Sequence, residues 1–163
     1  MLESLASLFA PWAGYYADHT WLSTAITYSH IAALLWGGGR AVTADLMTLR
    51  SRGLNEFRAE GHLKFLKASH RDVLMGLTVA AISGVLMFTS DFKHFVNAPV
   101  YWAKMYSVAI LLGNGVFLTR AERGLDVGGG TAEAAFAPAR RHAAVSLFLW
   151  FGTTLLGLLV STA

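Results

Sequence analysis

The sequence contains no cysteine. Disulfide bonds, thiolate metal sites, iron–sulfur clusters and covalently attached c-type haem are therefore excluded from this chain. Charged residues are also scarce, because Asp, Glu, Lys and Arg make up only 14% of the 163 residues, whereas 55% are hydrophobic. Soluble domains usually carry about a quarter charged residues. The shortfall therefore indicates that much of the chain is built for a solvent other than water.

The charge deficit is concentrated in four long runs without Asp, Glu, Lys or Arg, at 20–39, 73–90, 105–119 and 143–163. About 20 mainly apolar residues in a helix cross the hydrocarbon of a bilayer. We predict an all-α integral membrane protein: one domain over 1–163, folded as an antiparallel bundle of four transmembrane helices. The predicted spans lie near 21–49, 70–90, 98–120 and 141–161. The alternative is a soluble all-α protein with an unusually apolar core.

The first residues lack the basic start and long apolar centre of a cleaved signal peptide. Their apolar side chains recur at helical spacing, at Leu2, Leu5, Leu8, Phe9 and Trp12. This pattern predicts an amphipathic helix over 1–18 that lies on the membrane surface. A disordered terminus is the alternative.

Basic residues favour one side of the predicted bundle. Ten of the thirteen Lys and Arg residues fall in the connections after the first and third spans or at the span ends that border these connections. They are Arg50, Arg52, Arg58, Lys64, Lys67, Arg71, Arg120, Arg123, Arg140 and Arg141. The positive-inside bias places these connections in the cytoplasm of a bacterial inner membrane, with both ends of the sequence outside. The net charge of +3 is thus explained by topology, and no motif indicates nucleic-acid binding.

Two connections carry further local signals. Asn97 can cap a helix and Pro99 can open one, so the third span is predicted to begin there. The connection after the third span is rich in Gly and Ala, and we predict irregular structure between about residue 121 and Pro138.

Several polar side chains fall inside the predicted spans, where they are costly unless they face a protein interior. At about 1.5 Å of rise per residue, His30 and Lys104 lie in the outer half of the membrane. Arg40 and Asp45 lie in the inner half, where they pair with each other or extend to the cytoplasmic surface. His70 and His142 open the second and fourth spans at the cytoplasmic boundary.

Histidines on different helices at one level can hold a haem in a helical bundle. His70 and His142 are the favoured axial pair for a b-type haem, and His30 with an outer-side partner is the second candidate. Arg40, Arg71 or Arg141 would bind the propionates. The structural alternatives are interfacial histidines at 70 and 142, a hydrogen bond between His30 and another helix, and a Lys104 that extends to the outer surface. Gly37, near the face of His30, leaves room for a flat ligand or for a close helix.

Three stretches, "SHIAALLWGGGRAVTADLMTLR", "SGVLMF" and "NAPVYWAKMYSVAILLGNGVFLTR", resemble a family of bacterial four-helix integral membrane proteins. More distantly they are similar to copper-resistance D-type proteins and to the bacterial haem-binding membrane protoporphyrinogen oxidase. Those proteins also use a histidine of the first helix and a lysine of the third. The resemblance therefore implies that His30 and Lys104 belong to a cofactor site.

Three functions follow as hypotheses. The first is electron transfer by a b-type haem, with a quinone as electron partner. The second is a non-catalytic subunit that packs against other membrane subunits or against copies of itself, through small residues on the spans. The third is an enzyme that oxidises porphyrinogens with His30 and Lys104. Hydrolysis has no support, because there is no Ser-His-Asp order, no HExxH motif and no carboxylate pair within one predicted span.

Overall fold

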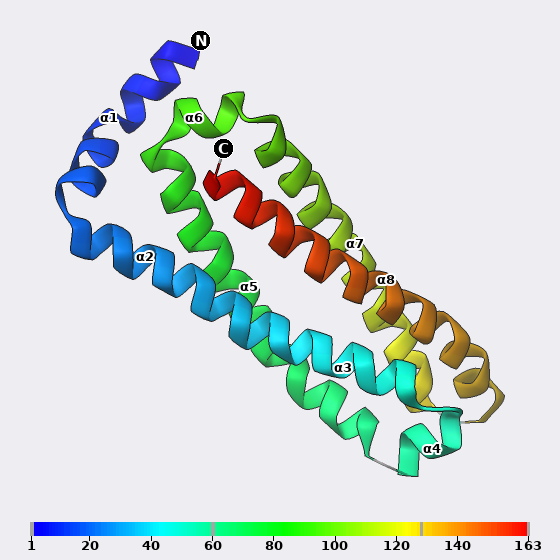
Figure 1. Ribbon diagram of the computed structural model, residues 1–163. Helices are drawn as coiled ribbons and strands as arrows, with labels where there is room; N and C mark the ends of the chain where they lie inside the picture. The colour runs from blue at the N-terminus through cyan, green and yellow to red at the C-terminus, as the bar shows by residue number, and fades with distance from the viewer. Residues whose placement is uncertain (1, 60, 128, 163) are drawn as a thin grey trace.

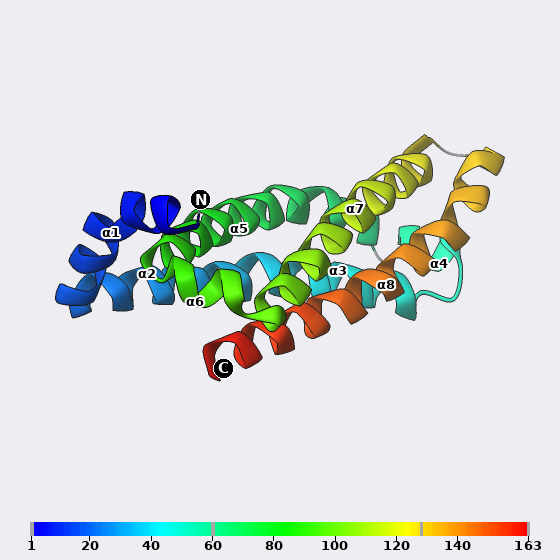
Figure 2. The same cartoon turned by 90° about the horizontal axis from the view of Figure 1, so that it is seen from above.

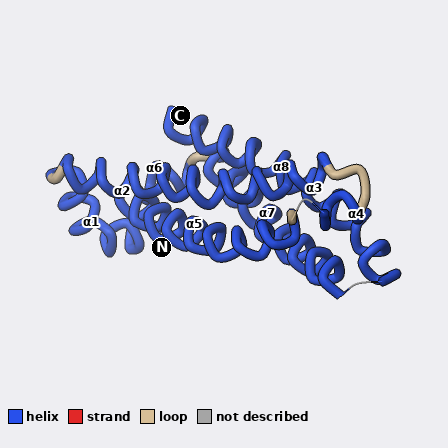
Figure 3. Tube along the Cα trace, turned by 90° about the horizontal axis from the view of Figure 1, so that it is seen from below, coloured by secondary structure: helices blue, strands red, loops and turns tan. Residues whose placement is uncertain are grey.

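The computed structural model describes residues 2–59, 61–127 and 129–162, and these residues are almost entirely helical (Figures 1 and 3). The long elements are α1 (Leu2–Asp18), α2 (Thr20–Ala33), α3 (Gly39–Arg50), α5 (His62–Ser90), α7 (Pro99–Val127) and α8 (Gly129–Thr162). Short elements join them: η1 (Leu34–Gly38), α4 (Leu54–Ala59) and α6 (Phe92–Asn97). The predicted all-α class is confirmed.

α2, η1 and α3 form one continuous rod that crosses α5 (Figure 1). η1 is a single turn of π-helix, and it includes two residues of the three-glycine run. A Cβ added at Gly76 of α5 would lie 2.7 Å from the Gly37 Cα. The two backbones therefore touch where the helices cross, and the role of Gly37 is helix packing rather than space for a ligand.

α7 and α8 pack against each other along their lengths, α2 packs on α5, and α3 lies against both α5 and α8. In contrast, α5 and α7 meet at few positions. α4, the end of α7 and the start of α8 gather at one end of the molecule, the α4 end (Figures 1 and 2). α1 and α6 lie at the opposite end, the α6 end.

α1 confirms the helix predicted over the first residues. It is attached to α5, because the Trp12 indole donates a hydrogen bond to the Leu86 carbonyl at 3.0 Å. Phe9 also packs on Phe92 of α6, with ring centroids 5.4 Å apart. Its position on a membrane surface stays a prediction.

The prediction of an irregular segment before Pro138 is wrong. α7 continues to Val127, α8 begins at Gly129, and Pro138 lies inside α8. The alanines of this segment are strong helix formers, and packing of Ala132 and Phe136 outweighs the glycines and the hydrogen bond that proline removes. Both residues are buried.

A cluster of buried apolar residues forms the core of the α4 end. Phe57 and Leu125 are fully buried at its centre, and the Phe57 ring meets Phe136 edge-on at 5.9 Å. Arg58 closes the cluster by donating a hydrogen bond to the Leu125 carbonyl at 2.8 Å. The members are Ala44, Leu54, Phe57, Leu66, Leu125, Ala132, Phe136 and Ala139.

The rest of the bundle has an apolar exterior. Phe148 is 79% exposed and Leu35 73% exposed, and both lie in mid-bundle. Two helical segments, His62–Ser90 and Gly130–Thr162, are long and apolar enough to cross a membrane by length and composition.

Candidate functional site

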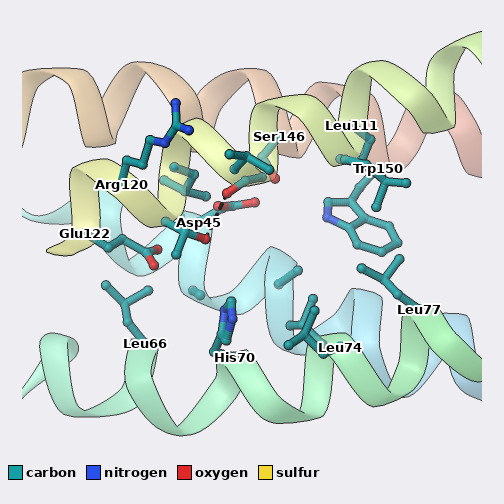
Figure 4. A pocket seen from close by; sticks show the side chains of 18 of the residues that line it. Asp45, Leu66, His70, Leu74, Leu77, Leu111, Arg120, Glu122, Ser146 and Trp150 are labelled. Carbon is teal, nitrogen blue, oxygen red and sulfur yellow. Dashed lines mark hydrogen bonds between the residues drawn. The ribbon is translucent and has the colours of Figure 1, made fainter.

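A cavity of about 560 Å³ opens where α5 and α7 diverge, with α3 and α8 behind it (Figure 4). Leucines of α5 and α7 and the Trp150 ring of α8 line its apolar part. Polar side chains gather toward the α4 end. They are Asp45, His70, Thr119, Arg120, Glu122, Arg123 and Ser146.

Asp45 is the most buried acid of this cavity, with only 2% of the residue exposed. The Ser146 hydroxyl donates a hydrogen bond to its carboxylate across the α3–α8 contact (Figure 4). The second oxygen, Oδ2, is buried and has no hydrogen-bond partner among the described residues. A buried carboxylate oxygen without a donor is unfavourable. Asp45 Oδ2 is therefore free to accept a hydrogen bond from a group in the cavity.

Glu122 faces the same cavity from α7, two residues beyond the predicted third span. Burial raises the pKa of Glu122 to about 7. Arg120 does not neutralise the two acids directly, because its guanidinium lies over the Phe117 ring at 5.7 Å and turns away from them (Figure 4).

The predicted pairing of Arg40 with Asp45 is wrong. Arg40 instead forms an ion pair with Asp72 of α5 at 3.0 Å and lies over the Phe65 ring at 4.9 Å. Five residues along a helix turn a side chain by about 140° relative to its starting direction. Arg40 and Asp45 therefore point to different neighbours, α5 and α8.

His30 is held by α5. Its Nδ1 lies 3.0 Å from the Ser83 Oγ, and its ring lies over Gly84, where an added Cβ would be 3.4 Å from Cε1. The Ser83 hydroxyl donates to the Val79 carbonyl at 2.7 Å, so its oxygen accepts from His30. The Ala80 carbonyl, 3.2 Å from Ser83 Oγ, is a second acceptor for the Ser83 hydroxyl.

We assign the tautomer of the neutral imidazole from these hydrogen bonds. His30 carries its proton on Nδ1, and the lone pair is on Nε2, the nitrogen that commonly binds a metal. Lys104, half-buried on α7, lies within electrostatic range of His30. Its Nζ would be 3.5 Å from a Cβ on Gly157 of α8. Both residues lie toward the α6 end, at the similar level that the sequence predicted.

His142 is held in the same tautomer by Asn114. The Asn114 amide nitrogen donates to the His142 carbonyl at 2.9 Å, which leaves Oδ1 to accept from His142 Nδ1 at 2.8 Å. The ring stacks on Phe117 with centroids 5.7 Å apart. His70 is exposed on α5 and lines the cavity, so these two histidines have different surroundings.

No group of three or more His, Asp or Glu side chains among the described residues could hold a metal ion.

Four important residues were not singled out from the sequence: Asp72, Ser83, Glu122 and Trp150. Ser83 stands directly before Gly84 in the quoted stretch "SGVLMF", and a small polar residue beside a glycine is a usable signal for a helix contact. Asp72 and Glu122 resembled ordinary charges at the ends of spans. Only the packing of α3 against α5 and of α7 against α8 shows what they face.

No family model, curated protein or solved structure matches this chain. The family resemblance drawn from the sequence stays a prediction.

Proposed function

We propose that this chain crosses a bacterial inner membrane four times, through the α2–η1–α3 rod, α5, α7 and α8. The support is the distribution of side chains: large apolar groups cover the outside of the bundle, while Asp45, Ser83, Asn114 and Ser146 are buried within it. Such an exterior is unfavourable in water and is expected in lipid. The basic connections place the α4 end in the cytoplasm and the α6 end outside.

We further propose that this membrane protein binds a b-type haem and transfers electrons, with His30 as an axial ligand. The observation that carries this proposal is the hydrogen bond between His30 Nδ1 and Ser83, which leaves Nε2 without a hydrogen bond to any of the described residues. A histidine oriented by a hydrogen bond on its other nitrogen is the usual form of a haem ligand. The haem would supply a one-electron redox centre, and the protein supplies its orientation.

Lys104 is the proposed outer-side partner of His30, either as the second ligand or as a cation for a propionate. Its position on the opposite helix pair suits both roles, because α2 packs on α5 while α7 packs on α8. Gly84 lies directly against His30 and Gly157 directly against Lys104, because a Cβ at either glycine would be in ordinary van der Waals contact with that side chain.

The pair of His70 and His142 is the second arrangement. Asn114 holds His142 with its Nε2 lone pair unused, as Ser83 holds His30. Asn114 holds the His142 ring, whereas His70 is exposed on α5. This difference between the two rings favours the arrangement with His30.

Absorption spectra of the protein purified from haem-replete cells test the proposal. We expect a Soret band and a sharp reduced α-band in the wild type. His30→Ala should abolish the spectrum, Lys104→Met should shift it, and Ser83→Ala should broaden or shift it because His30 loses its orientation. His94→Ala, at an exposed position of α6, is the matched control and should leave it unchanged.

Loss of the bands in His70→Ala and His142→Ala, with His30→Ala unchanged, would move the haem to the α4 end. A colourless protein that takes up no added haemin would overturn both arrangements. A non-catalytic membrane subunit would then be the better interpretation.

A further inference from the structure

The cavity between α5 and α7 contains a polar group that the proposed haem site does not use. Asp45 lines the cavity, and its Oδ2 is buried and has no hydrogen-bond donor among the described residues. The Ser146 hydroxyl donates a hydrogen bond to the other oxygen. Glu122 adds a second carboxylate at the same end of the cavity (Figure 4). This end therefore offers acceptors and calls for a ligand that donates hydrogen bonds.

The remainder of the cavity is apolar. Leu74 and Leu77 of α5 face Leu111 and Leu112 of α7 across it, and the Trp150 ring forms its back. Since α5 and α7 meet at few positions, the cavity opens sideways between them, toward the lipid of the proposed membrane. A ligand can enter from the bilayer without crossing water.

We propose that this cavity binds the hydroxylated aromatic headgroup of a membrane quinol. One hydroxyl donates to Asp45 Oδ2, the ring lies among the leucines and Trp150, and the apolar tail leaves between α5 and α7. A volume of about 560 Å³ falls within the range of small-molecule sites. The inference rests on the membrane placement of the proposed function and is independent of the haem.

Other ligands fit the cavity less well. A phospholipid would bring its phosphate beside Asp45 and Glu122, and Arg120 turns away from these acids (Figure 4). An oxidised quinone has only acceptor oxygens and leaves Asp45 Oδ2 without a donor. A metal ion would meet fewer than three His, Asp or Glu ligands among the described residues.

Calorimetric titration of the full-length protein in detergent with decylubiquinol, under anaerobic conditions, tests the proposal. We expect one saturable site in the wild type. Asp45→Asn should weaken binding at least about tenfold, because the amide has a single acceptor oxygen and Ser146 already donates to one oxygen at this position. The oxidised form, decylubiquinone, should bind the wild type more weakly than the quinol, and Asp45→Asn should reduce this difference, since an amide can donate.

Gly115→Leu provides a test that leaves the polar groups intact. Gly115 lines the cavity, and a Cβ added there meets no atom within 4 Å, so a larger side chain at this position would extend into the space of the cavity. This variant should abolish quinol binding. Gly113→Leu is the matched control on the same helix, because it also has free space but lies outside the cavity lining. Asp91→Asn, at an exposed position, is the control for the loss of charge.

Absence of quinol binding to the wild type would overturn the proposal. The proposal would also be overturned if the Gly115→Leu variant bound quinol like the wild type, or if the Asp45→Asn variant bound quinol with unchanged affinity. The haem proposal fails separately, because the histidine variants are scored by absorption and the quinol titration works equally on colourless protein.

Discussion

The α4 end and the middle of the bundle are built in opposite ways. At the α4 end Phe57 is 0% exposed, while charged residues such as Arg58 and Glu133 lie outside. In mid-bundle Phe148 is 79% exposed, while Ser83 is only 4% exposed. One helix, α8, carries both patterns, because it buries Phe136 and exposes Phe148.

Under the proposed membrane placement, the reversal follows from the local solvent rather than from the residue type. Water expels apolar groups into a core, as at the α4 end. Lipid provides no such force between helices, so contacts there depend on small residues and interior polar groups. The Gly37–Gly76 crossing and the Asn114–His142 hydrogen bonds are contacts of this second kind.

The largest expected effect lies in the core of the α4 end. Phe57→Ala removes a fully buried ring that touches His62 and Phe136. We expect a loss of about 3–5 kcal/mol in the free energy of unfolding. Thermal unfolding in detergent micelles, followed by circular dichroism, measures it. A loss below about 1 kcal/mol would mean that this end does not fold as a water-type core.

The next effect concerns the helix crossing in mid-bundle. Gly76→Ala places a Cβ 2.8 Å from the Ala33 carbonyl oxygen, and backbone atoms cannot turn aside. Overpacking of this kind costs about 1–3 kcal/mol. Gly39→Ala on α3 is the control, because its Cβ meets no atom within 4 Å and alanine favours the helix. Equal stabilities of the two variants would show that the rod and α5 are farther apart.

A smaller effect is expected for the coupling energy between Arg40 and each of two acids, Asp72 and Asp45. A double-mutant cycle of Arg40→Met with Asp72→Asn should give a coupling of about 0.5–1 kcal/mol, since both side chains are partly exposed and screened. The same cycle with Asp45→Asn should give a coupling near zero. A larger coupling to Asp45 would restore the pairing that the sequence suggested.

The smallest effect is expected at the lipid-facing surface. Phe148→Ala should change the free energy of unfolding by less than about 0.5 kcal/mol in micelles, because the ring is exposed in both states. The unfolding assay used for Phe57→Ala allows a direct comparison. A loss that matches Phe57→Ala would mean that Phe148 packs against another protein chain.

The sequence predicted the helices well because long apolar runs have few alternative structures. It also placed His30 and Lys104 at one level, since helical rise is constant. It could not assign Arg40 to Asp72, because that pair depends on the rotation of α3 about its axis. It missed Ser83 and the cavity for a similar reason: both depend on how closely α5 approaches α2 and α7. The Gly/Ala-rich segment before Pro138 was misread, because local turn signals do not include the packing of Phe136 on Phe57.

Labelling of single cysteines tests the reversal most directly, and the chain has no cysteine of its own. Asp91→Cys, Glu133→Cys and Phe148→Cys place a thiol at three exposed positions. With a membrane-impermeant maleimide, Asp91→Cys should react in intact cells and Glu133→Cys only after permeabilisation. Phe148→Cys should react in neither, because lipid covers it. Reaction of Phe148→Cys as fast as Glu133→Cys would show that water surrounds the whole bundle, and would contradict the account.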